Sequence, residues 1–415
     1  MKVKTLKVNI TPSVGVELCG FANRIQPSTH ILDQLFCKIL FLGERDSLFV
    51  LMQFDLIGFD PGFCTGFRER LSTFFALPIS HIQVFASHTH SGPCSLHLNA
   101  CGAYDPEYLV FLEGLIFNKL IREREQSQAE KECSVTWYES SAKLGQNRRG
   151  RVDSENSNNL GILALRDGNG DYSALLINYP MHPVCLKGQG ISADYPGQIA
   201  CLLGEELPGN PIVLFGLGPC GDIDPPAVGV SYKTMVEWGH QIAKPVIQLL
   251  GSDSTTGSNP VPEFKQDILT WPLEVLTEEE IDNQADKFLM DQSGLEEFGV
   301  NYHLAIESWR ANRKANLHAG AASEVQLTID RIRLGTLNLV FLNAEVFSAI
   351  SELIKSNHSD KYWLISCANG LVGYLPDLQQ YNLGGYESEI SHVFYDSLRI
   401  TSGALECLSR EVLNY

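Results

Sequence analysis

The chain has 415 residues, of which 44% are hydrophobic, and its formal net charge at pH 7 is -18. This length and composition indicate a globular protein with a large core, and the negative charge argues against nucleic acid or an anionic membrane as a partner. A neutral or cationic small molecule is a better match for such a charge. No apolar run approaches the roughly 18 to 20 residues that span a bilayer, so we expect no transmembrane segment.

The N-terminus and the cysteines indicate the cellular compartment. Residues 1–8 alternate between polar and apolar types and lack the continuous apolar centre of a secretory signal. The 11 cysteines are odd in number and scattered, and several lie in apolar runs, which is typical of reduced and buried thiols. We therefore expect a cytoplasmic protein without a disulfide framework.

Strands and helices alternate along the first half of the chain. Apolar runs predict strands at 6–10, 35–42, 48–56 and 82–86. Helical spacing predicts a helix over 61–75, and Asp105-Pro106-Glu107 supplies the N-cap, first-turn proline and early acid of a helix that ends near 125. Three more strands are predicted at 135–138, 161–165 and 174–179, with a hairpin turn at 167–170.

The second half continues this alternation. A helix opens within 192–197 and runs through 203, and a strand at 212–215 and a helix at 236–250 follow. Residues 251–262 are linker-like, Thr277 and Glu280 form a capping box, and a helical run covers 303–317. Strands return at 324–334, 337–342 and 362–366. We expect an α/β fold with mixed β-sheets flanked by helices and an active site in loops at strand ends, as one domain over 1–415 with a helical insertion at about 263–320.

The stretch Ser87-His88-Thr89-His90-Ser91-Gly92-Pro93 directly follows a predicted buried strand. Residues two apart in an extended segment point the same way, so His88 and His90 can face one pocket while Thr89 points elsewhere. One ring suits a metal ion through a neutral imidazole nitrogen, and the other suits proton transfer near neutral pH. The alternative interpretation is a pair of histidines with structural hydrogen bonds in a loop or in the core.

Four other positions combine a strand end or a loop with a chemically useful side chain. His182, in Met181-His182-Pro183, repeats the strand-then-histidine arrangement. Glu345 follows a predicted strand and is either a helix-start acid or a metal ligand. Asp55 is either a pocket residue or a turn or helix-entry carboxylate. The cationic run Asn147-Arg148-Arg149-Gly150-Arg151 is either a solvated loop or an arginine fork for a carboxylate or a developing oxyanion.

Two glycine-flanked tyrosines, Tyr374 and Tyr386, complete the set of candidate residues. In this order the motifs resemble those of the neutral ceramidase family, non-lysosomal zinc amidases that cleave the N-acyl bond of ceramide. The resemblance rests on Ser87-His88-Thr89-His90-Ser91-Gly92-Pro93, Asn147-Arg148, Met181-His182-Pro183, Ser192-Ala193-Asp194-Tyr195-Pro196-Gly197, Gly221-Asp222-Ile223-Asp224-Pro225, Glu345, Gly373-Tyr374 and Tyr386-Glu387.

The resemblance implies a bound zinc ion, with the ligands His88, His182, Glu345 and Tyr374. Around the reacting carbonyl it implies His90, Arg148 and Tyr386. Zinc in such a site polarises a carbonyl and makes hydroxide available at neutral pH, and the three surrounding residues stabilise the oxyanion and deliver a proton to the leaving amine. Two histidines with oxygen ligands also suit manganese or iron.

The sequence departs from the family in three respects. Asp224 stands where the family has a serine, and our hypothesis is that it acts as a general base on water or binds a cationic group of the substrate. The chain ends at Tyr415, which leaves no room for the family's C-terminal immunoglobulin-like domain, and it carries neither a secretion signal nor a mucin-like stalk. We therefore expect a ceramidase-like amidase that acts on a small or lipid-like N-acyl substrate more soluble than ceramide.

Two other functions stay open. The first is a zinc-dependent esterase or lactonase that uses the same site, and the second is a metal-binding homologue without catalysis, for which Asp224 is the only hint. A role in lipid metabolism, and in sphingolipid metabolism in particular, follows from the resemblance alone. The sequence gives no indication of the oligomeric state.

Overall fold

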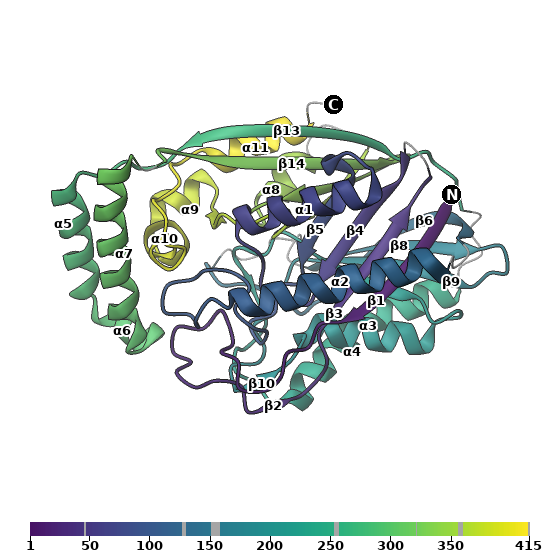
Figure 1. The fold of residues 1–415 in the computed structure, drawn as a ribbon, viewed down its shortest axis with the longest axis horizontal. Coiled ribbons are helices and arrows are strands. Elements are labelled where there is room, and N and C mark those ends of the chain that lie inside the picture. Colours follow the sequence, from purple (N-terminus) through teal and green to yellow (C-terminus); the bar gives the residue numbers. More distant parts are fainter. Residues whose placement is uncertain are drawn as a thin grey trace.

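The computed structural model describes residues 1–44, 47–126, 130–150, 158–252, 257–320, 322–355 and 360–413. Arg151 of the cationic run and residues 253–256 of the linker-like segment lie outside the described residues. The described chain forms two large β-sheets that pack face to face, with helices on the outer face of each, and three two-stranded sheets in the loops (Figure 1). This arrangement of four layers confirms the predicted α/β class with mixed sheets.

The larger sheet has eight strands in the order β11-β9-β8-β6-β1-β3-β4-β5. Its strands are β1 (Lys2–Asn9), β3 (Phe36–Leu42), β4 (Phe49–Phe54), β5 (Ile82–Ala86), β6 (Lys131–Ser141), β8 (Asn159–Asp167), β9 (Tyr172–Tyr179) and β11 (Ile212–Leu217). Strand β4 runs parallel to β5, and β9 runs parallel to β11, while the other neighbouring strands are antiparallel.

The smaller sheet has four strands in the order β13-β14-β15-β17. They are β13 (Glu263–Pro272), β14 (Glu324–Leu334), β15 (Leu337–Leu342) and β17 (Lys361–Ile365). Side chains alternate between the two faces of a strand, so each sheet supplies one face to a shared apolar layer. In β4, Phe49 and Leu51 face the smaller sheet, whereas Val50 and Met52 face the covering helices.

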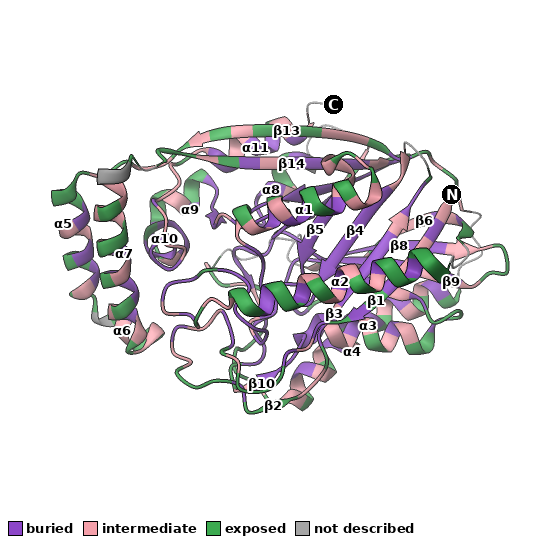
Figure 2. Cartoon of the chain, viewed as in Figure 1, coloured by how far each residue is buried: buried purple, intermediate pink, exposed green. Residues whose placement is uncertain are grey.

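Amphipathic helices cover the outer face of both sheets. Over the larger sheet lie α1 (Pro61–Phe75), α2 (Pro106–Gln126), α3 (Asp194–Glu206) and α4 (Tyr232–Gly251), and over the smaller sheet lie α8 (Ile350–Lys355) and α11 (Ala404–Leu413). Figure 2 shows that inner strands such as β4 and β5 are buried, while the covering helices expose one side. No described helix has both the length and the hydropathy that a bilayer crossing requires.

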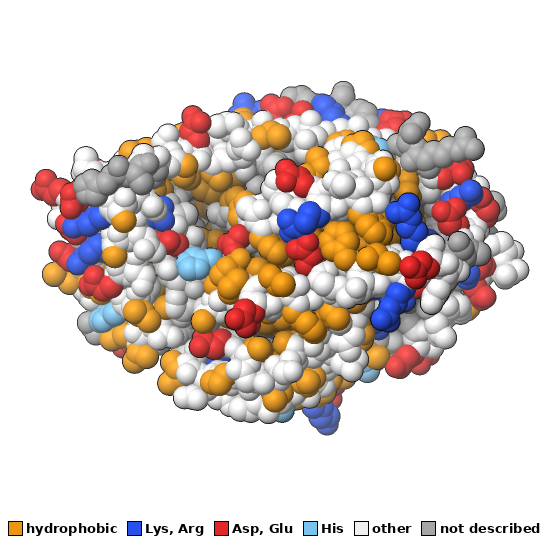
Figure 3. Space-filling view, viewed as in Figure 1, with side chains coloured by type: hydrophobic (Ala, Val, Ile, Leu, Met, Phe, Trp, Pro, Cys, Tyr) orange, Lys and Arg blue, Asp and Glu red, His pale blue; other side chains and the backbone are white. Residues whose placement is uncertain are grey.

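Three helices follow β13 and precede β14 in the sequence: α5 (Glu278–Leu289), α6 (Gln292–Phe298) and α7 (Asn301–Ala319). They lie at the left of Figure 1. The capping box of Thr277 and Glu280 at the start of α5 is confirmed. Ion pairs such as Arg310 with Asp282 join α5 and α7, and acidic and basic side chains lie side by side over these helices in Figure 3.

The predicted helical insertion began too early, because its first part is the strand β13, which pairs with β14 along all of its length. Strand β13 lies at the edge of its sheet, and its residues are exposed or at most half-buried. Its apolar pattern in the sequence is therefore weak. The division into a single domain stays a prediction, although the two sheets share one apolar layer.

Short elements form the loops at the strand ends, where the predicted site residues lie. These elements are β2 (His30–Ile31), β7 (Gln146–Asn147), β10 (Gly190–Ile191), β12 (Ile223–Asp224), β16 (Glu345–Val346), β18 (Tyr374–Leu375), α9 (Leu378–Leu383), the π-helical turn η4 (Tyr386–Ile390) and α10 (Ser391–Phe394). Glu345 therefore does not begin a helix, since it belongs to β16, which pairs in parallel with β18.

Asp55 is neither a pocket residue nor a turn carboxylate. Its side chain is buried, forms an ion pair with Lys38 at 3.1 Å, and accepts hydrogen bonds from the Phe36 amide and the Gln53 side chain. This polar cluster ties β3 to β4 inside the sheet. The carboxylate balances a buried lysine and is not available to a substrate.

Candidate metal centre

The candidate residues come from loops that follow the carboxyl ends of strands in both sheets. His88 follows β5, His182 follows β9, and Glu345 follows β15. Ligand sites in sheets with parallel strands form at such ends, because the loops that leave neighbouring strands meet there. Three segments far apart in the sequence are brought together in this way.

Each of the three histidines uses one ring nitrogen to hold its orientation. The Nδ1 atoms of His88, His182 and His90 lie 2.6, 2.9 and 3.2 Å from the backbone oxygens of Ile57, Cys220 and Gly20. A carbonyl oxygen can only accept, so the proton of each neutral ring is on Nδ1. The Nε2 atoms therefore carry lone pairs, which is the form that binds a metal ion.

The ligand atoms of the three histidines lie within 4.8 Å of one another, and so do those of His182, Cys220 and Glu345. Glu345 Oε2 lies 2.9 Å from His182 Nε2 and 3.4 Å from His88 Nε2, and His90 Nε2 lies 3.3 Å from His88 Nε2. A tetrahedral zinc ion with bonds of roughly 2.0–2.1 Å places its ligand atoms about 3.3 Å apart. The spacing of these atoms therefore fits a zinc ion.

Two atoms of this cluster are buried and have no hydrogen-bond partner among the described residues: His182 Nε2 and Glu345 Oε2. Burial raises the pKa of the Glu345 carboxyl, but His88 and His182 beside it hold that pKa well below its usual range. Burial and the two neighbouring rings lower the pKa of His90 well below its usual range. Burial lowers the pKa of His182, but Cys220 and Glu345 beside it raise that pKa well above its usual range. A divalent metal requires an ionised carboxylate and neutral imidazoles, so metal binding here would release a proton from His182.

The backbone around the histidines is adapted to this convergence. His88 has a φ of +70°, in the left-handed region that side chains other than glycine rarely adopt, and such strain collects at functional sites. Gly20, with a φ of +105°, lies so close to His90 that an added Cβ atom would be 2.4 Å from Nδ1. Gly20 is a site residue that the sequence analysis missed, because its role depends on a distant ring.

Two tyrosines border the Glu345 carboxylate. The Tyr374 ring is stacked at 6.4 Å on the ring of His182, and burial and the nearby Glu345 raise the pKa of its hydroxyl well above the usual range. Tyr395, which the sequence analysis missed, donates a hydrogen bond to Glu345 Oε1. Tyr374 is thus next to the predicted metal position, and Tyr395 orients the carboxylate from the other side.

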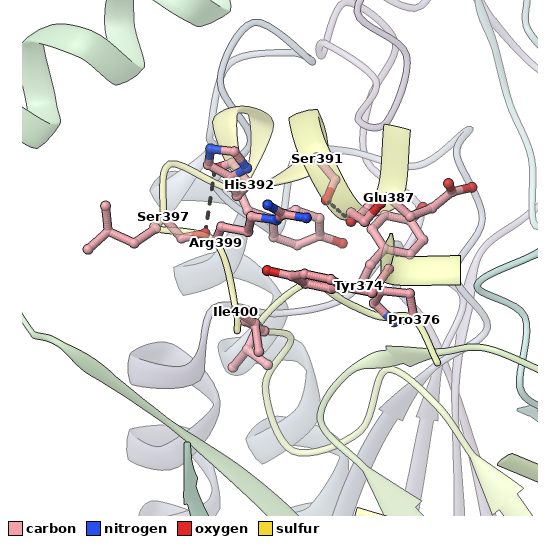
Figure 4. A pocket seen from close by; sticks show the side chains of 14 residues that line it. Tyr374, Pro376, Glu387, Ser391, His392, Ser397, Arg399 and Ile400 are labelled. Carbon is pink, nitrogen blue, oxygen red and sulfur yellow. Dashed lines mark hydrogen bonds between the residues drawn. The ribbon is translucent and has the colours of Figure 1, made fainter. Parts of the chain in front are cut away.

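A cavity of about 20 Å³ borders Tyr374, Tyr395 and Glu387 (Figure 4). Figure 4 also shows Ser391, whose hydroxyl donates to the Glu387 carbonyl at 2.8 Å. This volume admits about one water molecule, and the buried Ser388 hydroxyl on its wall has no partner among the described residues. The cavity is therefore suited to a structural water and is too small for a substrate.

The arginine run forms a fork around carboxylates of the protein itself. Arg148 Nε donates to Glu387 Oε1 at 2.7 Å and Nη1 donates to Asp224 Oδ1 at 3.1 Å. Arg149 Nη1 donates to the other oxygen of Glu387, also at 2.7 Å. The interpretation as a carboxylate-binding fork is the one that the structure supports, and Glu387 is the partner that the sequence analysis did not assign.

A buried carboxylate joins these loops to the site. Asp222, which is fully buried, accepts hydrogen bonds from the Ser348 amide at 2.7 Å, the Ser348 hydroxyl at 2.9 Å and the Asn147 amide group at 2.7 Å. It therefore connects the β11–β12 loop with β7 and with the segment after β16. Asp222 belongs to one of the sequence motifs, but its role could not be predicted because its partners lie far away along the chain.

Tyr386 and Asp224 flank the cluster. The Tyr386 ring lies 5.8 Å from the ring of Tyr374, and its hydroxyl makes no hydrogen bond within the described part of the chain. Asp224 Oδ1 lies 3.9 Å from His182 Nδ1 and is held by Arg148, while its second oxygen has no partner among the described residues. The eight predicted site residues are thus gathered in one region, although their roles stay predictions.

The chain resembles solved structures of ceramidases in fold but not in sequence. No family model matches the sequence, and no curated protein is significantly similar to it. The crystal structure of neutral ceramidase from Pseudomonas aeruginosa matches with a TM-score of 0.67 and 14% identity, over 98% of this chain and 77% of that one. A ceramidase complexed with C2 matches with a TM-score of 0.71 and 13% identity, over 99% of this chain and 73% of that one. The predicted resemblance to neutral ceramidases is therefore confirmed for the fold.

Proposed function

We propose that this protein is a metal-dependent hydrolase that cleaves a linear amide bond of the N-acyl type. The observation that supports this proposal is that His88, His182 and Glu345 lie close together in a chain with the neutral ceramidase fold. Two of their buried ligand atoms have no hydrogen-bond partner among the described residues. Zinc is the ion that we propose, because two or three imidazole nitrogens and a carboxylate are a common zinc ligand set.

The protein's residues divide into a metal-binding group and a group around the substrate. We assign the metal to His88, His182, Glu345 and Tyr374, as the resemblance implies. A zinc ion held there supplies a Lewis acid that polarises the amide carbonyl and activates water. His90 is only half-buried, whereas the other two histidines are buried, so it is the ring best placed to exchange a proton with the leaving nitrogen.

Tyr386 and Arg148 serve the carbonyl oxygen in this proposal. The unpartnered Tyr386 hydroxyl donates a hydrogen bond to the oxygen that becomes negatively charged. Arg148 keeps Glu387 and Asp224 in place and adds positive charge near the same region. A substrate more soluble than ceramide and a cytoplasmic location stay proposals that come from the sequence.

The proposal is tested by measuring the zinc content of the purified protein together with the hydrolysis of short N-acyl amines and of matched esters. We expect about one zinc per chain and a higher kcat/KM for the amides. Hydrolysis of the esters alone would support an esterase or lactonase. Zinc binding without hydrolysis of either series would support a metal-binding homologue, and failure to bind any zinc would overturn the metal site.

Asp224→Asn is expected to lower kcat by about 100-fold while zinc stays bound. The free oxygen of Asp224 is the group available as a general base on water, and asparagine keeps the hydrogen bond with Arg148 but loses the basic carboxylate. Zinc content and kcat are measured on the same preparation. An unchanged kcat with bound zinc would rule out the general-base role.

A further inference from the structure

A second cavity, of about 340 Å³, lies beside Tyr386 where the end of α5 and helix α6 meet η4. Its size is within the usual range of small-molecule pockets. Three carboxylates line it: Asp291, Glu297 and Glu389. Lys287 is the only lysine or arginine among the described lining residues, so the cavity has an excess of negative charge.

Aromatic rings connect this cavity with the candidate metal centre. Tyr374 lies 5.8 Å from Tyr386, Tyr386 lies 5.3 Å from Phe298, and Phe298 lies 5.6 Å from Tyr302, measured between ring centroids. Tyr386, Phe298 and Tyr302 also line the cavity. Tyr386 therefore borders both Tyr374 of the candidate metal centre and the cavity.

Two polar groups of the cavity have no partner of their own. Asp291 caps α6 and Glu389 accepts from the Gly385 amide at 2.9 Å, whereas Glu297 is exposed and makes no ion pair or hydrogen bond within the described residues. The side chain of Tyr302 is only 1% exposed, and its hydroxyl likewise has no hydrogen bond there. Burial, together with the nearby carboxylates of Asp291 and Glu297, raises the pKa of the Tyr302 hydroxyl to about 12.

Carboxylates combined with aromatic rings select for positive charge. An ammonium group gains from the ring faces and from the carboxylates, whereas a carboxylate or phosphate ligand is repelled. A neutral acyl chain would leave the buried Tyr302 hydroxyl without a partner and would offer no counter-charge to the exposed Glu297 carboxylate. The cavity chemistry thus separates a cationic ligand from an anionic or purely apolar one.

We propose that this cavity binds a second, positively charged nitrogen of the substrate, so that the natural substrate class is N-acyl derivatives of diamines and polyamines. This inference rests on the proposed amidase function. In the reaction the carbon–nitrogen bond of the amide breaks, the hydroxyl of water joins the acyl carbon, and the proton goes to the leaving nitrogen. The products are a carboxylic acid and the free diamine, whose distal ammonium group occupies the cavity.

The test compares N-acetylputrescine with an uncharged analogue in which a hydroxyl replaces the free amine. We expect the wild type to hydrolyse N-acetylputrescine with a kcat/KM at least about tenfold higher than that of the analogue. Glu297→Gln is expected to remove most of this preference through KM. Glu296→Gln is the matched control, because it removes the same charge from the neighbouring position of α6, which does not line the cavity.

Binding of putrescine itself, followed by calorimetry, provides a readout that does not depend on turnover. We expect Glu297→Gln, but not Glu296→Gln, to weaken putrescine binding by about tenfold. Equal hydrolysis of both substrates, with no effect of Glu297→Gln on their ratio or on putrescine binding, would overturn the amine site and leave the amidase function intact. Binding of putrescine that depends on Glu297, without hydrolysis of either amide, would support the amine site and overturn the amidase function.

Discussion

Replacing His182 with alanine is expected to reduce the zinc content from about one ion per chain to none and to abolish amide hydrolysis. His182 Nε2 is the ligand atom nearest to Glu345, at 2.9 Å, and its orientation is held by the Cys220 carbonyl. Alanine removes the nitrogen and leaves the Glu345 carboxylate as an uncompensated buried charge. Metal analysis of the dialysed protein and an amidase assay measure the two effects.

His97→Ala is the matched control for this experiment. His97 is exposed on the same loop as the two metal-facing histidines, and its ring packs against Tyr104 at 6.0 Å. This variant is expected to keep zinc and activity. Stoichiometric zinc in His182→Ala after dialysis would contradict the assignment of the ligands.

The same experiment has a readout in thermal stability. Zinc at about 100 times its dissociation constant adds about 2.7 kcal/mol to the free energy of unfolding through mass action. We expect added zinc to raise the Tm of the wild type and of His97→Ala, and to leave the Tm of His182→Ala unchanged. Loss of the zinc-dependent shift thus distinguishes a lost ligand from a merely destabilised fold.

Tyr386→Phe is expected to lower kcat by about 100- to 1000-fold, with little change in KM or zinc content. The hydroxyl has no hydrogen-bond partner among the described residues, so it is free to donate to the carbonyl oxygen as negative charge develops. Phenylalanine keeps the ring and its contact with Phe298, at 5.3 Å, so the walls of the site stay in place.

Steady-state kinetics on one amide substrate measure this effect, with Tyr381→Phe as the control. Tyr381 lies in α9, five residues before Tyr386 in the sequence, and its ring is covered by the Arg399 guanidinium at 4.0 Å. The control is expected to keep its kcat. A normal kcat in Tyr386→Phe would show that another group stabilises the oxyanion.

Much of the fold was predictable because its elements carry strong local signals. The helix 61–75 agrees with α1 at both ends, since Pro61 suits a first turn, and the strands 324–334 and 337–342 agree with β14 and β15. Strand β13 was missed because an edge strand is only half-buried and its apolar pattern is weak. Local patterns therefore identified core elements and failed at the periphery of the sheets.

The candidate site was only partly predictable. The loops of His88, His182 and Glu345 follow strands with clear signals, but their convergence results from the packing of two sheets, which no local pattern encodes. Tyr395 and Gly20 were missed because their roles depend on residues far away in the sequence. Asp55 was misinterpreted, because its lysine partner was not recognisable from the sequence.

The origin of the ligands has a mechanical consequence for the molecule. His88 and His182 extend from the larger sheet, whereas Glu345 leaves the smaller one, and the two sheets otherwise adhere through an apolar layer. A metal ion bound by all three residues would cross-link distant parts of the chain. Such a cross-link shortens the loops that the chain can form when it is unfolded or partly opened. The sheets of the metal-loaded protein should therefore separate more slowly under denaturing conditions than those of the metal-free protein.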